Sequence, residues 1–166
     1  LMHAWLLGHV GQVAGDADLI ASGEQRAHQI MERFERFGDI DEYNSPTYDG
    51  IDLFALALWV AHPPTPTYER SGAALLAHLG ARTSTLYHRQ LGAMCGPYIR
   101  AYGLDLQRYV SLAGIWLHIV GESTSSILPT VLDQDTVHVH DLYFLPLMLR
   151  LAPSVRGDLT LQAVTV

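Results

Sequence analysis

Two stretches of this chain are apolar around most of a helix's circumference, and they limit the folds open to it. Residues 51–60 and residues 110–119 both consist largely of leucine, isoleucine, valine, phenylalanine, alanine and tryptophan. A helix of this kind has to be buried on most sides. Each stretch is too short to span a bilayer. The chain is therefore expected to fold as a helical protein in which these two helices lie inside.

Helical spacing of apolar residues predicts further helices around these two. The clearest covers residues 17–37, where Ala27, Ile30 and Phe34 form part of one stripe and Gly38 supplies the C-cap. The expected helices cover residues 1–14, 17–37, 47–61, 67–83, 106–120 and 142–151. Residues 158–164 alternate between polar and apolar side chains, which is typical of a strand. We expect an all-α domain of antiparallel helical hairpins over 1–156 and a strand-like, β-type tail over 157–166 that would begin a further β region.

Composition narrows the class of protein. The chain has 166 residues, 49% of them hydrophobic and 16% charged, which favours one globular domain with a core. The net charge is -7 and no basic run exists, so a nucleic-acid partner is not expected. The single cysteine excludes an internal disulfide and a thiolate cluster. We expect a soluble protein with no membrane partner and no cofactor, with the cytoplasm favoured as its compartment.

The densest group of polar side chains lies in residues 42–48, just before an expected helix. This segment offers a carboxylate, an amide, two phenols and hydroxyls, which is the kind of set that binds sugars. A purely structural interpretation is equally available, in which Ser45 or Thr47 caps the helix and Asn44 forms a turn.

A second polar loop covers residues 96–105. Tyr98 and Tyr102 flank Arg100, and an arginine fork suits a carboxylate such as that of a uronic acid. The alternative is an ion pair of Asp105, with either Arg100 or Arg108, that only orders the loop. His88 lies between the two loops and could act as a general base near neutral pH, or be structural.

Residues 138–141 read His-Val-His-Asp, and an extended backbone would place both histidines on one face. Two imidazoles and a carboxylate can bind a divalent metal. Because no further ligand occurs at a diagnostic spacing, surface histidines are the default and no metal site is expected.

One pattern occurs twice along the chain: a proline-containing polar loop precedes an apolar helix. The segment 42–48, followed by Asp52, Leu53 and Trp59, resembles segments of the six-hairpin (α/α) toroid superfamily, which includes glycoside hydrolases and polysaccharide lyases. The later segments 96–98 and 102–105 fit the same pattern.

The resemblance implies inner helices over 49–61 and 106–120, with loops that line a central cleft for a carbohydrate. A complete toroid needs about twelve helices, roughly twice the number expected here. The rest of the ring would come from a homo-oligomer or from the remainder of a larger chain.

Two mechanisms follow from the resemblance. A hydrolase needs two carboxylates ~5 or ~6.5–9.5 Å apart, and a lyase needs a uronate neutralised by Asn44 and Arg100 with Tyr48 or His88 as base. Acids are plentiful in the first loop, so the hydrolase is favoured. The same sequence also fits a non-catalytic helical binding module or an inactive fragment of a larger enzyme. The expected catalytic residues are Glu42, Asp52 and Asp105, with Asp49 as a further acid; the expected substrate-binding residues are Tyr43, Asn44, Tyr48, His88, Tyr98, Arg100 and Tyr102.

Overall fold

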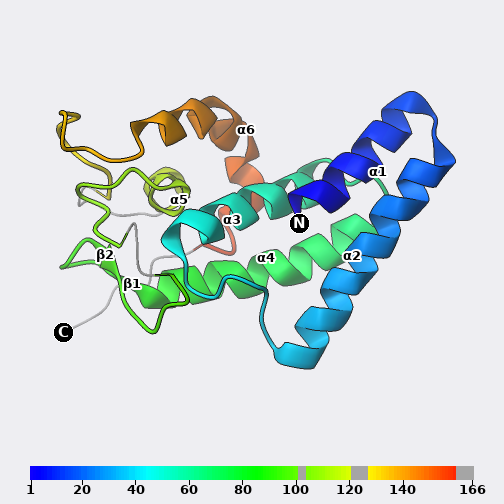
Figure 1. Cartoon of the computed structure of the whole chain (residues 1–166), viewed down its shortest axis with the longest axis horizontal. Helices are drawn as coiled ribbons and strands as arrows, with labels where there is room; N and C mark the ends of the chain where they lie inside the picture. Colours follow the sequence, from blue (N-terminus) through cyan, green and yellow to red (C-terminus); the bar gives the residue numbers. More distant parts are fainter. Residues whose placement is uncertain (101–103, 121–126, 160–166) are drawn as a thin grey trace.

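The computed structural model describes residues 1–100, 104–120 and 127–159, and over these ranges the chain is mainly helical (Figure 1). The expectation of an all-α fold is confirmed at this level. A small antiparallel sheet of two short strands is an addition that the sequence did not predict. The elements in chain order are α1 (Met2–Ala14), α2 (Ala17–Phe37), α3 (Pro46–Ala61), α4 (Pro66–Leu86), β1 (Tyr87–His88), β2 (Ala93–Met94), α5 (Leu112–Val120), the 3-10 helix η1 (Val139–Phe144) and α6 (Leu145–Val155).

In the first hairpin, formed by α1 and α2, α1 ends, and α2 begins and ends, at capping residues in the sequence. Gly15 ends α1 in the left-handed conformation with φ 68°, a position that glycine occupies without steric cost. Asp16 then caps α2, because its carboxylate accepts hydrogen bonds from the backbone N–H groups of Asp18 and Leu19, both at 3.0 Å. Gly38, at φ 75°, ends α2 at the expected residue.

Helix α3 lies at the centre of the molecule and contacts α1, α4, α5 and α6 (Figure 1). Its side chains are buried around most of the helix, as the sequence predicted. Trp59 and Leu53 are fully buried, and the Trp59 ring meets the Tyr68 ring of α4 edge to face at 4.7 Å. The core of the fold is therefore organised around α3.

Helices α3 and α5 touch backbone to backbone at Gly50. A Cβ atom added there would lie 2.2 Å from the amide nitrogen of Ala113. The Trp116 indole of α5 donates a hydrogen bond to the Gly50 carbonyl at 3.1 Å. Only a residue without a side chain allows this approach, so Gly50 fixes how the two apolar helices cross.

The expected helix over 106–120 is wrong in its first half, since α5 begins only at Leu112. The preceding backbone pairs with a distant segment instead. Val110 N–H donates to the Val137 carbonyl at 3.0 Å, and Val137 N–H donates to the Arg108 carbonyl at 3.1 Å. These bonds use backbone groups that a helix would need for its own turns.

The ends of the other helices differ less from the predicted ones. Helix α3 begins at Pro46, and α4 continues to Leu86 before the sheet. The last helix starts late, with Pro146 in the first turn of α6, as the proline suggested. Most of the expected strand over 158–164 lies outside the described residues. Among the described helices, none combines the length and the apolarity that a bilayer crossing requires.

We expect Gly50→Ala to lower the free energy of unfolding by about 3 kcal/mol, because the added methyl group forces two backbones apart. Chemical denaturation followed by circular dichroism measures the change. Gly157→Ala is the matched control, since its added Cβ meets no atom within 4 Å. Equal stability of the two variants would contradict the close helix crossing.

Candidate functional site

The two polar loops recognised in the sequence meet in the structure. Ile99 N–H donates to the Tyr43 carbonyl at 3.2 Å. The amide nitrogen of Asn44, which is fully buried, donates to the carbonyls of Cys95 at 2.6 Å and Pro97 at 2.7 Å. Asn44 therefore fastens one loop to the other, and its role in substrate binding stays a prediction.

An ion pair reinforces this junction at the surface. The Arg100 guanidinium donates two hydrogen bonds to the Glu42 carboxylate, at 2.7 and 3.2 Å. The same guanidinium lies 5.2 Å from the centre of the Tyr48 ring. The hydrogen bonds from Arg100 lower the pKa of Glu42, so this carboxylate is held in its ionised form. Within the described ranges, Arg100 pairs with Glu42, and the Asp105 carboxylate accepts a hydrogen bond from the Gln107 N–H.

A buried arginine that the sequence analysis missed lies beneath the first loop. Arg82 of α4 pairs with Asp39 and, at 2.8 Å, with Asp49 of α3. Its guanidinium also lies 4.9 Å from the centre of the Tyr43 ring. Burial raises the pKa of Asp49 to about 7, although the charge of Arg82 acts in the opposite direction.

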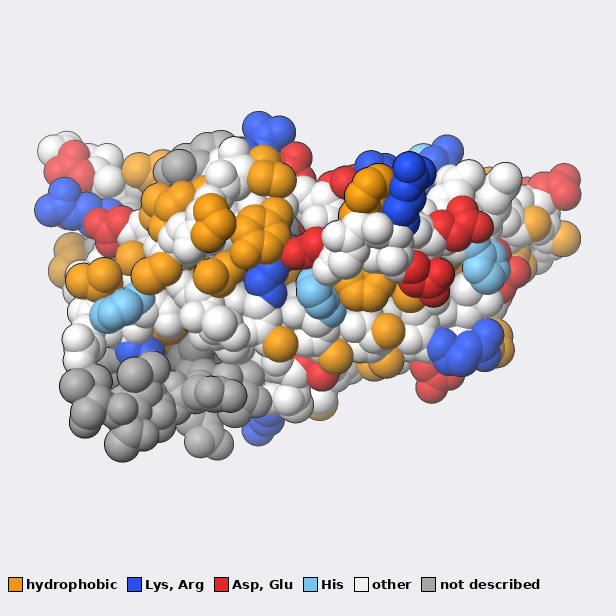
Figure 2. Space-filling view, turned by 90° about the horizontal axis from the view of Figure 1, so that it is seen from below, with side chains coloured by type: hydrophobic (Ala, Val, Ile, Leu, Met, Phe, Trp, Pro, Cys, Tyr) orange, Lys and Arg blue, Asp and Glu red, His pale blue; other side chains and the backbone are white. Residues whose placement is uncertain are grey.

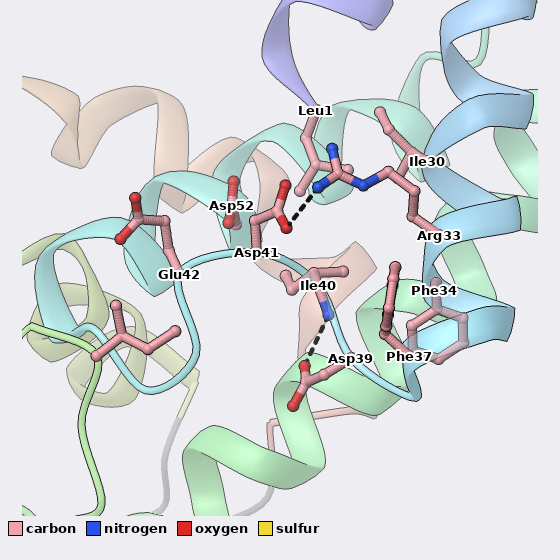
Figure 3. A pocket seen from close by; sticks show the side chains of 11 residues that line it. Leu1, Ile30, Arg33, Phe34, Phe37, Asp39, Ile40, Asp41, Glu42 and Asp52 are labelled. Carbon is pink, nitrogen blue, oxygen red and sulfur yellow. Dashed lines mark hydrogen bonds and ion pairs between the residues drawn. The ribbon is translucent and has the colours of Figure 1, made fainter.

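The loop, α2 and α3 enclose a pocket of about 510 Å³, drawn in Figure 3. Helix α2 gives one wall with two phenylalanine rings, and the loop gives carboxylates. Asp52 contributes its carboxylate from α3, and Figure 3 shows it between Glu42 and Asp41 in that view. The lining residues are Leu1, Ile30, Arg33, Phe34, Phe37, Asp39, Ile40, Asp41, Glu42, Asp52 and Ile99.

Asp52 is half-buried, and its environment favours the protonated form. Burial raises its pKa to about 6, and the nearby carboxylates of Glu42 and Asp41 add to this shift. The Leu1 amine and Arg82 oppose it without cancelling it. Two carboxyl groups of one pocket, Glu42 and Asp52, thus have pKa values moved in opposite directions.

Asp105, His88 and Tyr98 are not among the residues that line this pocket. Asp105 is exposed, and its carboxylate accepts the Gln107 N–H at 3.0 Å within its own turn. The exposed His88 ring accepts the Leu91 N–H at 3.2 Å, also locally. The Tyr98 hydroxyl donates to the Met94 carbonyl at 2.7 Å. Tyr102 falls outside the described residues.

On the face drawn in Figure 2, basic side chains stand beside acidic ones and do not gather into a patch. The pocket has the same mixed character on a smaller scale. Arg33 pairs with Asp41 at 3.1 Å, and both side chains are largely exposed. Such a pair contributes little to stability, so these two groups remain available to a ligand at the pocket rim.

A family model described as a domain of unknown function (DUF8769) matches residues 1–153. The chain belongs to this family. Neither the curated proteins nor the solved structures include a match to it.

The raised pKa of Asp52 predicts a pH effect on the stability of this DUF8769 domain. The folded state binds the Asp52 proton more tightly than the unfolded state does, so the contribution is present in full below about pH 4 and is lost as pH rises through about 6. We compare the free energy of unfolding of Asp52→Asn with that of the native chain. From pH 4 to pH 7 this difference is expected to shift in favour of the variant by about 2 kcal/mol. Denaturation curves at both pH values measure the difference.

Glu35→Gln is the control, because Glu35 is an exposed acid on α2 that does not line the pocket. It is expected to leave the pH dependence almost as it is. If Asp52→Asn and the native chain lose stability in parallel between pH 4 and pH 7, Asp52 does not have a raised pKa.

Proposed function

We propose that this chain is a carbohydrate-active domain of the glycoside hydrolase type, acting on an oligosaccharide or polysaccharide. The observation that supports it is the pair of carboxyl groups in one pocket: Asp52, with a pKa raised to about 6, and Glu42, with a pKa lowered by Arg100. Hydrolysis of a glycosidic bond uses one protonated and one ionised carboxyl group. Divergent pKa values in one site are how proteins assign these two roles.

In this proposal Asp52 is the general acid. Its proton goes to the glycosidic oxygen as the bond to the anomeric carbon breaks, so the departing sugar leaves as a neutral alcohol. A pKa near 6 leaves a useful fraction of Asp52 protonated close to neutral pH. The half-buried position of Asp52 in the pocket wall is what keeps the proton on it.

Glu42 is the ionised partner. Its negative charge stabilises the positive charge that develops at the anomeric carbon in the transition state. A water molecule forms the new bond to that carbon, and the proton that it loses returns to the Asp52 carboxylate. The bidentate contact with Arg100 holds the Glu42 carboxylate in one orientation. Glu42 has a φ of 62°, a conformation that few residues other than glycine adopt, and its side chain contacts Arg100 from this backbone.

The pocket walls suit a sugar ring. Phe34 and Phe37 of α2 offer aromatic faces for the apolar side of a pyranose, while Asp39 and Asp41 can accept hydrogen bonds from hydroxyl groups. The volume of about 510 Å³ lies within the usual range for small-molecule sites.

The lyase alternative has less support, because its neutralising residues are engaged. Asn44 is buried and donates to two backbone carbonyls. Arg100 is already paired with Glu42. A uronate would have to break that pair before Arg100 could bind it.

We also propose that the helices are part of an (α/α) toroid. Helix α3 contacts both α1 and α5, and α2 contacts α4. Contacts between alternate helices are what an inner and an outer ring of hairpins require. The pocket, at the N-terminal end of α3, would then open at the loop face of the ring.

We expect Asp52→Asn to lower the kcat for hydrolysis of neutral oligosaccharides by about 100-fold or more, the loss typical of a missing general acid. KM should change little, because the amide keeps the shape of the carboxyl group. Glu42→Gln should lose activity to a similar extent. The measurement is reducing-sugar release from a panel of neutral and uronic oligosaccharides.

Glu35→Gln is the matched control, an exposed acid on the same helix that forms the pocket wall. Binding of an oligosaccharide without turnover by the native chain would instead support the non-catalytic module. Activity that survives in Asp52→Asn, or an absence of both binding and turnover across the panel, would overturn the proposal.

A further inference from the structure

A second group of chemically reactive side chains lies at the start of η1, apart from the pocket lining. One nitrogen of His138, one nitrogen of His140 and one carboxylate oxygen of Asp141 all lie within 4.8 Å of one another. His138 Nδ1 is 3.7 Å from Asp141 Oδ2, and His140 Nε2 is 3.5 Å from Asp141 Oδ1. These separations exceed a hydrogen bond, so the three groups converge without being bonded to each other.

The local fold explains the convergence. His138 is the N-cap of the 3-10 helix η1, and Asp141 N–H donates to the His138 carbonyl at 2.9 Å. This turn brings His138 Nδ1 to within 3.7 Å of Asp141 Oδ2, three residues along the chain. In the extended backbone that the sequence suggested, Asp141 would point to the opposite face from the histidines. The helical turn therefore supplies the third ligand that the sequence pattern lacked.

The surrounding structure holds His138 in place. Its ring stacks on the Tyr109 ring, with centroids 4.6 Å apart and planes 25° from parallel. The Tyr109 hydroxyl lies 3.4 Å from the hydroxyl of Thr47 on α3. The backbone on the N-terminal side of His138 is paired with residues 108–110. The imidazole is thus oriented before any ligand arrives.

Two features of His138 are unfavourable unless a further contact offsets them. Its φ is 61°, in the left-handed region that non-glycine residues rarely occupy. Its Nδ1 atom is shielded from solvent and has no hydrogen-bond partner among the described residues. A buried nitrogen without a partner is costly, and a metal ion bound there would satisfy it.

We propose that His138 Nδ1, His140 Nε2 and the Asp141 carboxylate form a binding site for one divalent transition-metal ion of the zinc type. Ligand atoms about 2.0–2.1 Å from a tetrahedral zinc ion lie ~3.3 Å apart. The observed separations are 3.5 Å to Asp141 Oδ1 and 3.7 Å to Asp141 Oδ2, and the three ligand atoms lie within 4.8 Å of one another, so the side chains have to draw together around an ion. Small side-chain rotations would complete the geometry.

The donor set selects the class of ion. Two neutral imidazoles and one carboxylate suit zinc, cobalt, nickel or ferrous iron, whereas calcium and magnesium prefer oxygen ligands throughout. Three protein ligands leave at least one coordination position for water or another small ligand. His140 is exposed, so an ion can reach the site from solvent.

The test uses the full chain and cobalt(II) as a spectroscopic probe, with zinc as competitor. We expect one Co²⁺ per chain, with visible absorption of the intensity typical of a four- or five-coordinate ion, and displacement of Co²⁺ by one equivalent of Zn²⁺. His140→Ala should weaken Co²⁺ binding at least tenfold, since even the loss of an outer-sphere partner costs 10–100-fold. Asp141→Asn and His138→Asn should do the same, and asparagine tolerates the positive φ of position 138.

His28→Ala is the matched control, an exposed histidine on α2. It should bind Co²⁺ as the native chain does. Thermal unfolding shows which variants fold, and His140→Ala, with its exposed side chain, keeps the test valid if the others do not. Binding that is unchanged in His140→Ala, or native chain that takes up no Co²⁺ at millimolar concentration, would overturn the proposal.

Discussion

The buried guanidinium of Arg82 is the interaction on which the candidate site depends. A charge enclosed in this way has to be compensated by partners at close range. Arg82 satisfies that requirement by reaching from α4 to Asp49 on α3 and to Asp39 at the end of α2. Its guanidinium also packs against the Tyr43 ring, in the loop between α2 and α3. One side chain thus sets the positions of two helix ends and the loop between them.

The pocket follows from this arrangement. Once Asp39 and Tyr43 are held, the residues between them have to pass over the open side of α2 and α3. That path brings Glu42 to Arg100 and places it over the same cavity as Asp52. Asn44 closes the second loop onto the first. The opposite pKa shifts of Glu42 and Asp52 therefore arise from one structural constraint: Glu42 lies beside a surface arginine, and Asp52 is covered by the loop.

Helix positions that depend on nearby residues could be predicted from the sequence. Gly15, Asp16 and Gly38 act within one turn, and the ends of α1 and α2 fall where they indicate. The segment 106–111 shows the limit of this approach. Its apolar residues fit a helix, but its backbone bonds to Val137, which is far away along the chain. The spacing of apolar residues indicates which residues are buried. For a segment this short, a buried extended strand and a buried helix have the same sequence pattern.

The candidate site was also predictable from the sequence only in part. Glu42, Asp52 and Arg100 could be selected from the sequence because polar residues cluster around the start of a predicted helix. In the structure, Glu42 and Asp52 line the same pocket. Arg82 was missed; it lies near the C-terminal end of α4, between Ala81 and Thr83. A single arginine on the apolar side of a helix is itself a signal, because it requires a buried partner. Such a signal predicts that a partner exists and leaves its identity to the fold.

Backbone conformation connects the two candidate sites. Within the described ranges, the non-glycine residues with positive φ are Glu42, Asn44 and His138. Each such conformation costs about 1–2 kcal/mol unless contacts offset it. Asn44 gains two buried hydrogen bonds, and Glu42 gains the bidentate pair with Arg100. His138 stacks on Tyr109, yet its shielded Nδ1 has no hydrogen-bond partner in the described structure. A metal ion at this nitrogen would supply the compensating interaction that the other two positions already have.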